Sequence, residues 1–138
     1  MNDLKVKKIL LALSGCGTCN RLKTAAIIFK NGTILSVGYN GSVRGSAECS
    51  KIGCFIISNH CQNSVHAEEN AILNAARNGA SVLGGKIYCL HFPCRNCLKS
   101  IMNSGIREIV YYRNYNDESN KKLLRRYLDE GLLEVRKA

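Results

Sequence analysis

The hydrophobic pattern near the N-terminus predicts one helix followed by two strands. In residues 1–14 apolar and lysine side chains recur at a helical spacing, which is typical of an amphipathic helix. Two short runs rich in Ile and Val follow at 25–29 and 33–39, separated by a segment that contains Asn31-Gly32. An Asn-Gly pair between such runs is a strong signal of a β-hairpin. We therefore expect a helix and then an antiparallel pair of strands.

The rest of the chain alternates between helical and extended patterns. Residues 41–64 have no clear period and predict a long loop, which in a compact domain is usually functional or held in place. Helices are expected at 66–78, 95–103 and 117–130, and strands at 86–90, 108–112 and 132–135. Because strands and helices alternate, we expect an α/β fold with a mixed sheet flanked by helices.

Length and composition are those of a single globular domain over residues 1–138. The chain has 138 residues, of which 46% are hydrophobic and 22% charged, and this argues against a disordered, collagen-like or coiled-coil protein. No apolar run approaches the ~20 residues of a membrane span, and the run at 9–13 is too short for an export signal. We expect a cytoplasmic protein with no membrane partner.

The chain is strongly basic, with 20 Lys and Arg against 10 Asp and Glu and a formal charge of +10. Such a charge first suggests nucleic acid as a partner. The basic residues are scattered, however, and the one cluster at 121–126 is also typical of the solvated face of a helix. Dispersed cations suit small phosphorylated ligands equally well.

Two short segments carry most of the predicted chemistry. His66-Ala67-Glu68 is followed further along the chain by Pro93-Cys94 and, three residues after that cysteine, Cys97. This H-x-E…P-C-x-x-C pattern is the known signature of zinc-dependent nucleobase deaminases. With eight cysteines in a reducing compartment, metal binding is more probable than a disulfide framework.

The spacing of these residues suits a catalytic metal centre. Cys94 and Cys97 at the start of a helix can direct both sulfurs to one side, and His66 completes a set of three zinc ligands. Three protein ligands leave one zinc position open, where a water is activated at neutral pH. A structural zinc or a redox pair is the alternative for Pro-Cys-x-x-Cys alone, but the joint pattern favours a catalytic site.

Glu68 is the predicted acid and base. At a helix N-terminus both His66 and Glu68 can reach a metal that lies beyond the helix end, and the carboxyl can then move protons during the reaction. Glu69 is the second choice, because the motif names the second residue after the histidine.

At this point the chain resembles the deoxycytidylate deaminases of the cytidine-deaminase-like superfamily, including the bacterial proteins named for a late-competence operon. The resemblance runs from about residue 19 to 115 and includes Gly38-Tyr39-Asn40-Gly41 as well as the zinc motifs. It implies a cytidine-deaminase-like three-layer α/β/α fold with a mixed five-stranded sheet. It also implies hydrolysis of dCMP to dUMP and ammonia, which supplies thymidylate synthesis.

The resemblance assigns further roles by position. Asn40 matches a residue that holds the deoxyribose, Ala67 one whose backbone meets the cytosine edge, and Tyr115 a substrate-contacting tyrosine. From the sequence alone Asn40 could equally be a turn residue, and Tyr115 a structural one. The candidates for the 5′-phosphate are Lys23, Arg21 and Arg44. Arg77 matches a subunit-interface position, with an exposed helix-end arginine as the alternative.

The family also implies regulation and assembly. Many members form homohexamers, are activated by dCTP and are inhibited by dTTP with Mg²⁺. This chain departs from many of them in having Leu90 in place of Thr and Val43 in place of Pro. Val43 lies in the loop tied to regulation, so this departure bears on control by dCTP and dTTP.

A second, structural zinc is expected in the cysteine-rich loop. Related sequences share Cys19, Cys49, Cys54 and His60-Cys61, and some phage members bind a second, structural zinc through Cys19 and Cys49. The preferred ligands are Cys19, Cys49, Cys54 and Cys61, with His60 as a substitute. Such a site would anchor a loop with few apolar residues. The alternative is that these cysteines are reduced thiols packed in the protein interior. Cys89, in a predicted strand, is expected to be a buried small hydrophobic residue.

Two other functions remain open from the sequence. The first is the same chemistry on dCTP, a free nucleoside or a tRNA base, although the compact loop before His-Ala-Glu in tRNA deaminases is absent here. The second is a basic zinc module that binds nucleic acid without catalysis. Glu68 argues against such a module, because a structural zinc needs no neighbouring acid.

Overall fold

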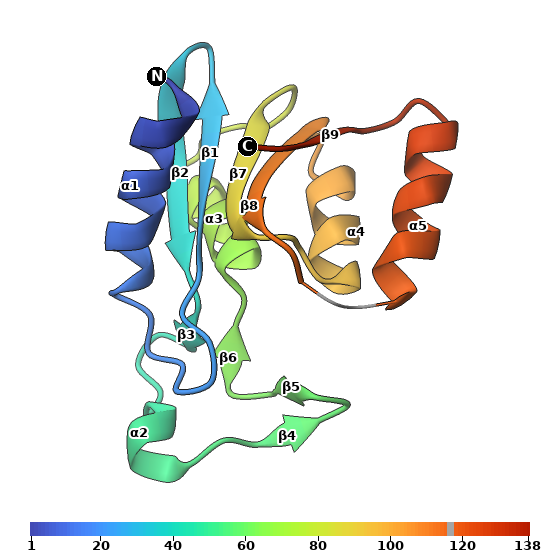
Figure 1. The fold of residues 1–138 in the computed structure, drawn as a ribbon. Helices are drawn as coiled ribbons and strands as arrows, with labels where there is room; N and C mark the ends of the chain where they lie inside the picture. The colour runs from blue at the N-terminus through green and yellow to red at the C-terminus, as the bar shows by residue number, and fades with distance from the viewer. Residues whose placement is uncertain (116–117) are drawn as a thin grey trace.

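The computed structural model describes residues 1–115 and 118–138 and contains a mixed five-stranded sheet (Figure 1). The strand order is β2 (Thr33–Tyr39), β1 (Ala25–Lys30), β7 (Lys86–His91), β8 (Glu108–Arg113) and β9 (Glu134–Lys137). β1 pairs antiparallel with β2 and β7, whereas β7, β8 and β9 are parallel. The predicted hairpin is confirmed, and Asn31 and Gly32 at its turn both have positive φ.

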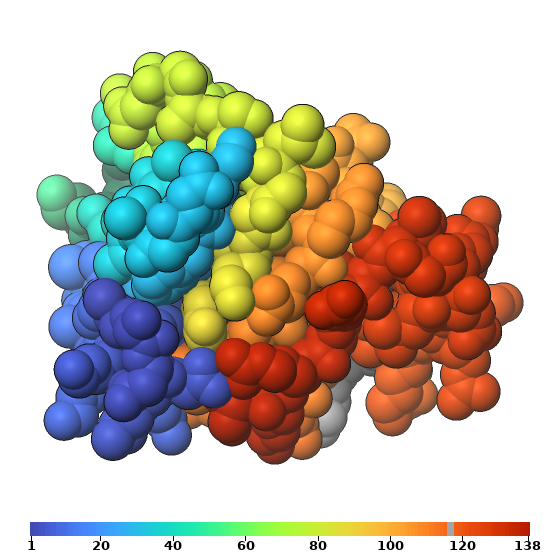
Figure 2. All heavy atoms as spheres, turned by 90° about the horizontal axis from the view of Figure 1, so that it is seen from above, coloured from blue at the N-terminus to red at the C-terminus, as the bar shows by residue number. Residues whose placement is uncertain are grey.

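Helices cover both faces of the sheet and give three layers. α1 (Asp3–Ser14) packs on one face, where Val6 and Leu10 are fully buried. α3 (Ala67–Arg77) and α4 (Arg95–Asn103) pack on the other face, and α5 (Glu118–Asp129) lies beside α4. Seen from above, α1 and α3 lie on opposite sides of the β1–β2 hairpin (Figure 2). The expected α/β/α architecture is confirmed.

α3 is held closely along the edge strand β2. The side chain of Ser36 donates a hydrogen bond to the Ala71 carbonyl (2.7 Å), and that of Asn74 donates to the Val37 carbonyl (2.8 Å). The helix presents small residues to the sheet, with Ala67, Ala71 and Ala75 all buried. This close approach determines where the first turn of α3 lies.

The sequence prediction was wrong in two segments. Residues 41–64 are more than a loop: they contain β3 (Gly41–Ser42), α2 (Cys49–Ile52), β4 (Ile56–Ile57), β5 (His60–Cys61) and the start of β6 (Ser64–Val65). These elements are too short to produce a hydrophobic period. The last strand was predicted at 132–135 but runs from Glu134 to Lys137. Leu133 precedes it and is buried in the core, and pairing with β8 begins only at Glu134. Residue 117 of the last predicted helix lies outside the described residues.

Candidate metal centre and substrate cavity

The three predicted zinc ligands meet where two helices begin. His66 is the N-cap residue of α3, and Cys94 is the N-cap residue of α4. The Nδ1 atom of His66 lies 3.4 Å from the Cys94 sulfur and 3.3 Å from the Cys97 sulfur. Tetrahedral zinc with ordinary Zn–N and Zn–S bonds separates such atoms by about 3.6 Å. Both distances from His66 are therefore close to those that a shared zinc ion requires, and all three donor atoms lie within 4.8 Å of one another.

Both helix N-termini direct their positive dipole ends towards this cluster. The sheet brings them together because β7 runs directly into Pro93 and Cys94, while α3 is fixed along β2 by its hydrogen bonds. Helix N-termini favour negative charge, so thiolate is stabilised here. The local chain directions thus create a site for a cation bound by anionic sulfur.

The protonation of the cluster without metal is strongly perturbed. Hydrogen bonds from Cys97 and His66 lower the pKa of Cys94 to about 4, so that Cys94 is a thiolate. The hydrogen bond with Cys94 raises the pKa of His66 to about 9, and the same thiolate raises the pKa of Cys97. Binding of a metal then displaces protons from His66 and Cys97, as is usual when ligands must be deprotonated.

Glu68 lies beside the donors and is almost completely buried, with 5% of its surface exposed. Burial raises the pKa of its carboxyl to about 7, and the nearby Cys94 thiolate acts in the same direction. A carboxyl with a pKa near neutral can both accept and return a proton under ordinary conditions. Glu69 is less buried and does not line the cavity described below.

A cavity of about 250 Å³ opens above the metal donors. Its walls include His66, Glu68 and Cys94, and the predicted substrate residues Asn40 and Tyr115 line the same cavity. Further lining residues are Cys19, Arg21, Leu22, Thr24, Asn59, His60, Cys61, Ser64, His91 and Phe92. The cavity is polar at several points around its wall, which suits a small polar ligand or a single base.

Asn40 is held firmly at this cavity. Its Oδ1 atom accepts a hydrogen bond from the Thr24 backbone N–H (2.9 Å), and its Nδ2 atom donates to the Leu22 carbonyl. One lone pair and one N–H of the amide remain for a ligand. Asn40 is therefore an oriented residue of the cavity wall rather than a residue of a free turn.

The predicted phosphate candidates are separated by the structure. Arg21 lines the cavity and donates to both the backbone oxygen and the side-chain Oδ1 of Asn59, at 3.2 and 3.0 Å. Arg44 instead donates to Asn74 (2.7 Å) in a shallow surface hollow that Arg77 also lines. Lys23 is exposed and is not part of the cavity wall.

His91 and Thr24 are two of the cavity residues that the sequence interpretation did not assign to the site. His91 at the end of β7 lies 2.9 Å from the Thr24 hydroxyl through its Nδ1 atom. Burial, together with the charge of Arg113, lowers the pKa of His91. A polar residue three positions before Cys94, at the carboxyl end of a core strand, was the signal that could have identified it.

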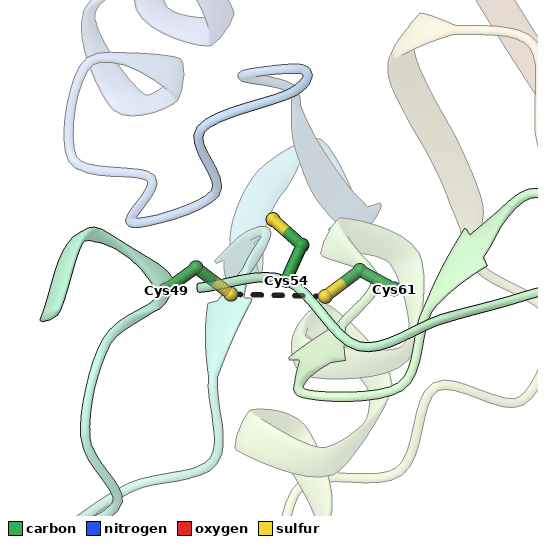
Figure 3. Close-up of side chains that lie close together, drawn as sticks. All are labelled: Cys49, Cys54 and Cys61. Atoms are coloured by element: carbon green, nitrogen blue, oxygen red, sulfur yellow. Dashed lines mark hydrogen bonds between the residues drawn. The ribbon is translucent and has the colours of Figure 1, made fainter. Parts of the chain in front are cut away.

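A second thiol cluster lies in the segment that protrudes below the sheet in Figure 1. The sulfurs of Cys49, Cys54 and Cys61 lie within 4.8 Å of one another, and those of Cys49 and Cys61 are 3.7 Å apart (Figure 3). The structure therefore unites three of the four residues predicted for a second metal. Cys19 and His60 are outside this group; they line the cavity, as Cys61 also does.

Cys89 is a fully buried residue of the core, as expected, and Cys16 is exposed near the end of α1. The basic residues at 121, 122, 125 and 126 are exposed on α5, in agreement with a solvated helix face. No helix among the described residues is both long and apolar enough to cross a membrane.

A His-Cys-Cys donor set at two helix N-termini, beside a buried carboxyl and on a mixed α/β/α sheet, defines the class of zinc-binding deaminase domains. The chain belongs to the cytidine and deoxycytidylate deaminase zinc-binding family, whose sequence pattern matches residues 2–113. The family resemblance inferred from the motifs is thereby confirmed.

Individual relatives agree with this assignment. The chain is 42% identical over 106 residues to ComE operon protein 2 of Bacillus subtilis, and the match spans 77% of this chain and 55% of that protein. It is 34% identical over 154 residues to the deoxycytidylate deaminase of Enterobacteria phage T4, covering 84% and 80% of the two chains. The structure of dCMP deaminase from cyanophage S-TIM5, solved with dCMP and dUMP, superposes with a TM-score of 0.82 at 29% identity. That match covers 100% of this chain and 99% of that chain.

Proposed function

We propose that the protein is a dCMP deaminase that converts dCMP and water to dUMP and ammonia. The observation that carries the proposal is the buried Glu68 carboxyl beside the His66-Cys94-Cys97 donor set, at the base of a small polar cavity. Relatives named deoxycytidylate deaminase, and a neighbour of the same fold solved with dCMP and dUMP, support the choice of substrate.

His66, Cys94 and Cys97 would hold a zinc ion, which would supply a water-derived nucleophile at neutral pH. Glu68 takes one proton from the attacking water and passes it to the ring nitrogen next to the attacked carbon. It then takes the second proton of that water to the departing amino group, which leaves as ammonia. Burial, which raises the pKa of this carboxyl to about 7 when no metal is bound, favours the return of the proton.

The substrate is oriented by the cavity wall. Asn40 offers its remaining amide groups to the deoxyribose, and Tyr115 closes the side of the cavity. The Ala67 backbone, which lies between the cavity residues His66 and Glu68, meets the cytosine edge in this proposal. Arg21 is the phosphate ligand, because it is the one of the three predicted cations that lines the cavity. A phosphate would replace Asn59 as the acceptor of its guanidinium N–H groups, in the two-point geometry that arginine favours.

Cys49, Cys54 and Cys61 hold a second, structural zinc. The 3.7 Å between the Cys49 and Cys61 sulfurs matches the separation of about 3.8 Å between two thiolates on tetrahedral zinc. Cys19, the fourth residue predicted, is buried on the adjacent segment and is the first choice to complete the set, with His60 as the substitute.

Assembly and regulation follow the family pattern in this proposal. We propose a cytoplasmic homohexamer that responds to dCTP and to dTTP with Mg²⁺. We assign the interface to the hollow lined by Arg44, Asn74 and Arg77, because Arg77 matches a subunit-interface position of the family. Size-exclusion chromatography with light scattering, with and without each nucleotide, tests both points.

A substrate panel tests the central proposal. Zinc-loaded protein is supplied with dCMP, deoxycytidine, dCTP and a tRNA substrate, and ammonia release is measured. The expected result is fast turnover of dCMP, weak turnover of deoxycytidine and no activity in Glu68→Ala that still holds zinc. Equal turnover of deoxycytidine and dCMP would contradict a phosphate-dependent enzyme, and preference for dCTP would favour the alternative substrate. Binding of nucleic acid without any turnover would favour the non-catalytic module.

A further inference from the structure

Asn120 is a buried amide of α5 that contacts the segment leading into the metal centre. Its side chain is 2% exposed, and its Nδ2 atom donates a hydrogen bond of 2.5 Å to the Pro93 carbonyl. Pro93 is itself buried and immediately precedes Cys94. The contact joins two segments that lie 27 positions apart in the sequence.

This amide is costly to bury. Among the described residues its Oδ1 atom has no hydrogen-bond partner, and an unpaired buried polar atom destabilises a fold. The remaining contact of α5 with the core is apolar and uses Leu123, Leu124 and Tyr127. An apolar residue at this position would avoid the unpaired oxygen. What an asparagine adds here is the hydrogen bond from its Nδ2 atom to the Pro93 carbonyl.

Pro93 offers few ways to be held in place. Proline has no N–H, so its carbonyl is the one backbone group through which a neighbour can orient it. Cys94 follows directly, and its position fixes both its own sulfur and the direction in which α4 begins. A residue that fixes the Pro93 carbonyl therefore also restricts where the Cys94 sulfur lies.

We propose that Asn120 is a positioning residue for the metal centre: it fixes the Pro93 carbonyl and so holds the Cys94 sulfur in the geometry that zinc requires. The proposal rests on the assignment of Cys94 as a zinc ligand in the proposed function, but not on the identity of the substrate. Loss of hydrogen bonds that orient metal ligands typically weakens metal binding by roughly 10- to 100-fold.

The test compares two variants of equal size with a control at the other end of α4. Asn120→Leu removes the donor and keeps an apolar volume, and Asn120→Asp replaces the donor by an acceptor. Ser104→Ala removes the hydrogen bond from Ser104 to the Ile101 carbonyl (2.7 Å), which is a side-chain bond remote from the metal donors. Zinc affinity is measured by chelator competition, the thiolate absorption bands are recorded after Co²⁺ substitution, and thermal unfolding is followed in parallel.

We expect both Asn120 variants to bind zinc about ten-fold or more weakly and to shift the cobalt–thiolate bands, while Ser104→Ala changes stability alone. Unchanged zinc affinity and bands in both Asn120 variants would overturn the proposal. An equal loss of affinity in Ser104→Ala would also overturn it, because the effect would then follow general stability. If Asn120→Leu does not fold, Asn120→Asp with its cobalt spectrum decides the matter. Because none of these measurements uses dCMP, a wrong substrate assignment would leave the result intact.

Discussion

Gly38 on β2 lies directly against Ala67, the residue between His66 and Glu68. A Cβ atom added at Gly38 would overlap the Ala67 carbonyl oxygen and the Ala71 backbone nitrogen. The first turn of α3, which carries both the histidine donor and the acid, therefore reaches its position because the strand has no side chain there.

Substitution Gly38→Ala should push α3 away from β2. We expect a loss of about 1–3 kcal/mol in the free energy of unfolding, as for other overpacked cores, together with weaker zinc binding. Gly45→Ala is the control, because Gly45 has φ of +80° but nothing within 4 Å of an added Cβ. It should cost stability through its backbone and leave zinc affinity unchanged. An unaltered melting temperature and zinc affinity in Gly38→Ala would contradict this account.

Replacement of Glu68 by Gln should abolish catalysis and keep the metal. The amide preserves shape but cannot take or return a proton, so turnover of dCMP should fall by about 10²- to 10⁴-fold. Zinc content should be unchanged, because Glu68 is not part of the His-Cys-Cys donor set. Ammonia release and metal analysis on the same sample decide the result. Near-normal turnover in this variant would remove Glu68 from the mechanism.

Glu68 should also give the metal-free protein a recognisable pH dependence. Burial raises the pKa of this carboxyl from an ordinary 4.5 to about 7, so between these values the folded state keeps a proton that the unfolded state has released. Stability from this group is present below pH 4.5 and is lost as pH rises towards 7, by up to about 3 kcal/mol. Denaturant unfolding with a chelator present should show this slope as the difference between wild type and Glu68→Gln. Parallel stability curves would contradict the buried, protonated carboxyl.

The regular elements and the metal donors could be predicted from the sequence because each has a local signal. The Asn31-Gly32 turn marks the hairpin, and the cysteine spacing at 94 and 97 already places two sulfurs on one helical turn. Arg21 could not be separated from Lys23 or Arg44 in this way. Which of these cations reaches the cavity depends on how the segment before β1 packs against the turn at Asn59, and that contact spans 38 positions. A contact between segments so far apart produces no local sequence pattern at either residue.

Arg21 should determine the preference for a phosphorylated substrate. Removing a charge-assisted, two-point contact costs about 1.5–3 kcal/mol, so Arg21→Ala should lower kcat/KM for dCMP by roughly ten- to a hundred-fold. Turnover of deoxycytidine, which has no phosphate, should change little. Lys23→Ala is the matched control, since Lys23 is an exposed cation of the same segment that lies outside the cavity wall. Equal losses for dCMP and deoxycytidine in Arg21→Ala would show that Arg21 shapes the cavity rather than binding phosphate.

The cysteine-rich segment should depend on its own metal. Between Cys49 and Cys61 four large apolar residues are substantially exposed, namely Ile52, Phe55, Ile56 and Ile57. Apolar burial therefore contributes little to holding the hairpin of β4 and β5, although its turn residue Asn59 forms part of the substrate cavity. A zinc on the three thiols would supply the missing constraint.

Cys54→Ser should accordingly reduce the zinc content from two per chain to one and raise KM for dCMP, because the turn that contacts Arg21 is no longer fixed. Cys16→Ser removes an exposed cysteine outside both donor groups and should change neither quantity. Metal analysis of reduced protein and steady-state kinetics measure the two effects on the same preparations. A single zinc per chain in the wild type would exclude the second site. Two zinc ions in Cys54→Ser would show instead that Cys54 is not one of its ligands.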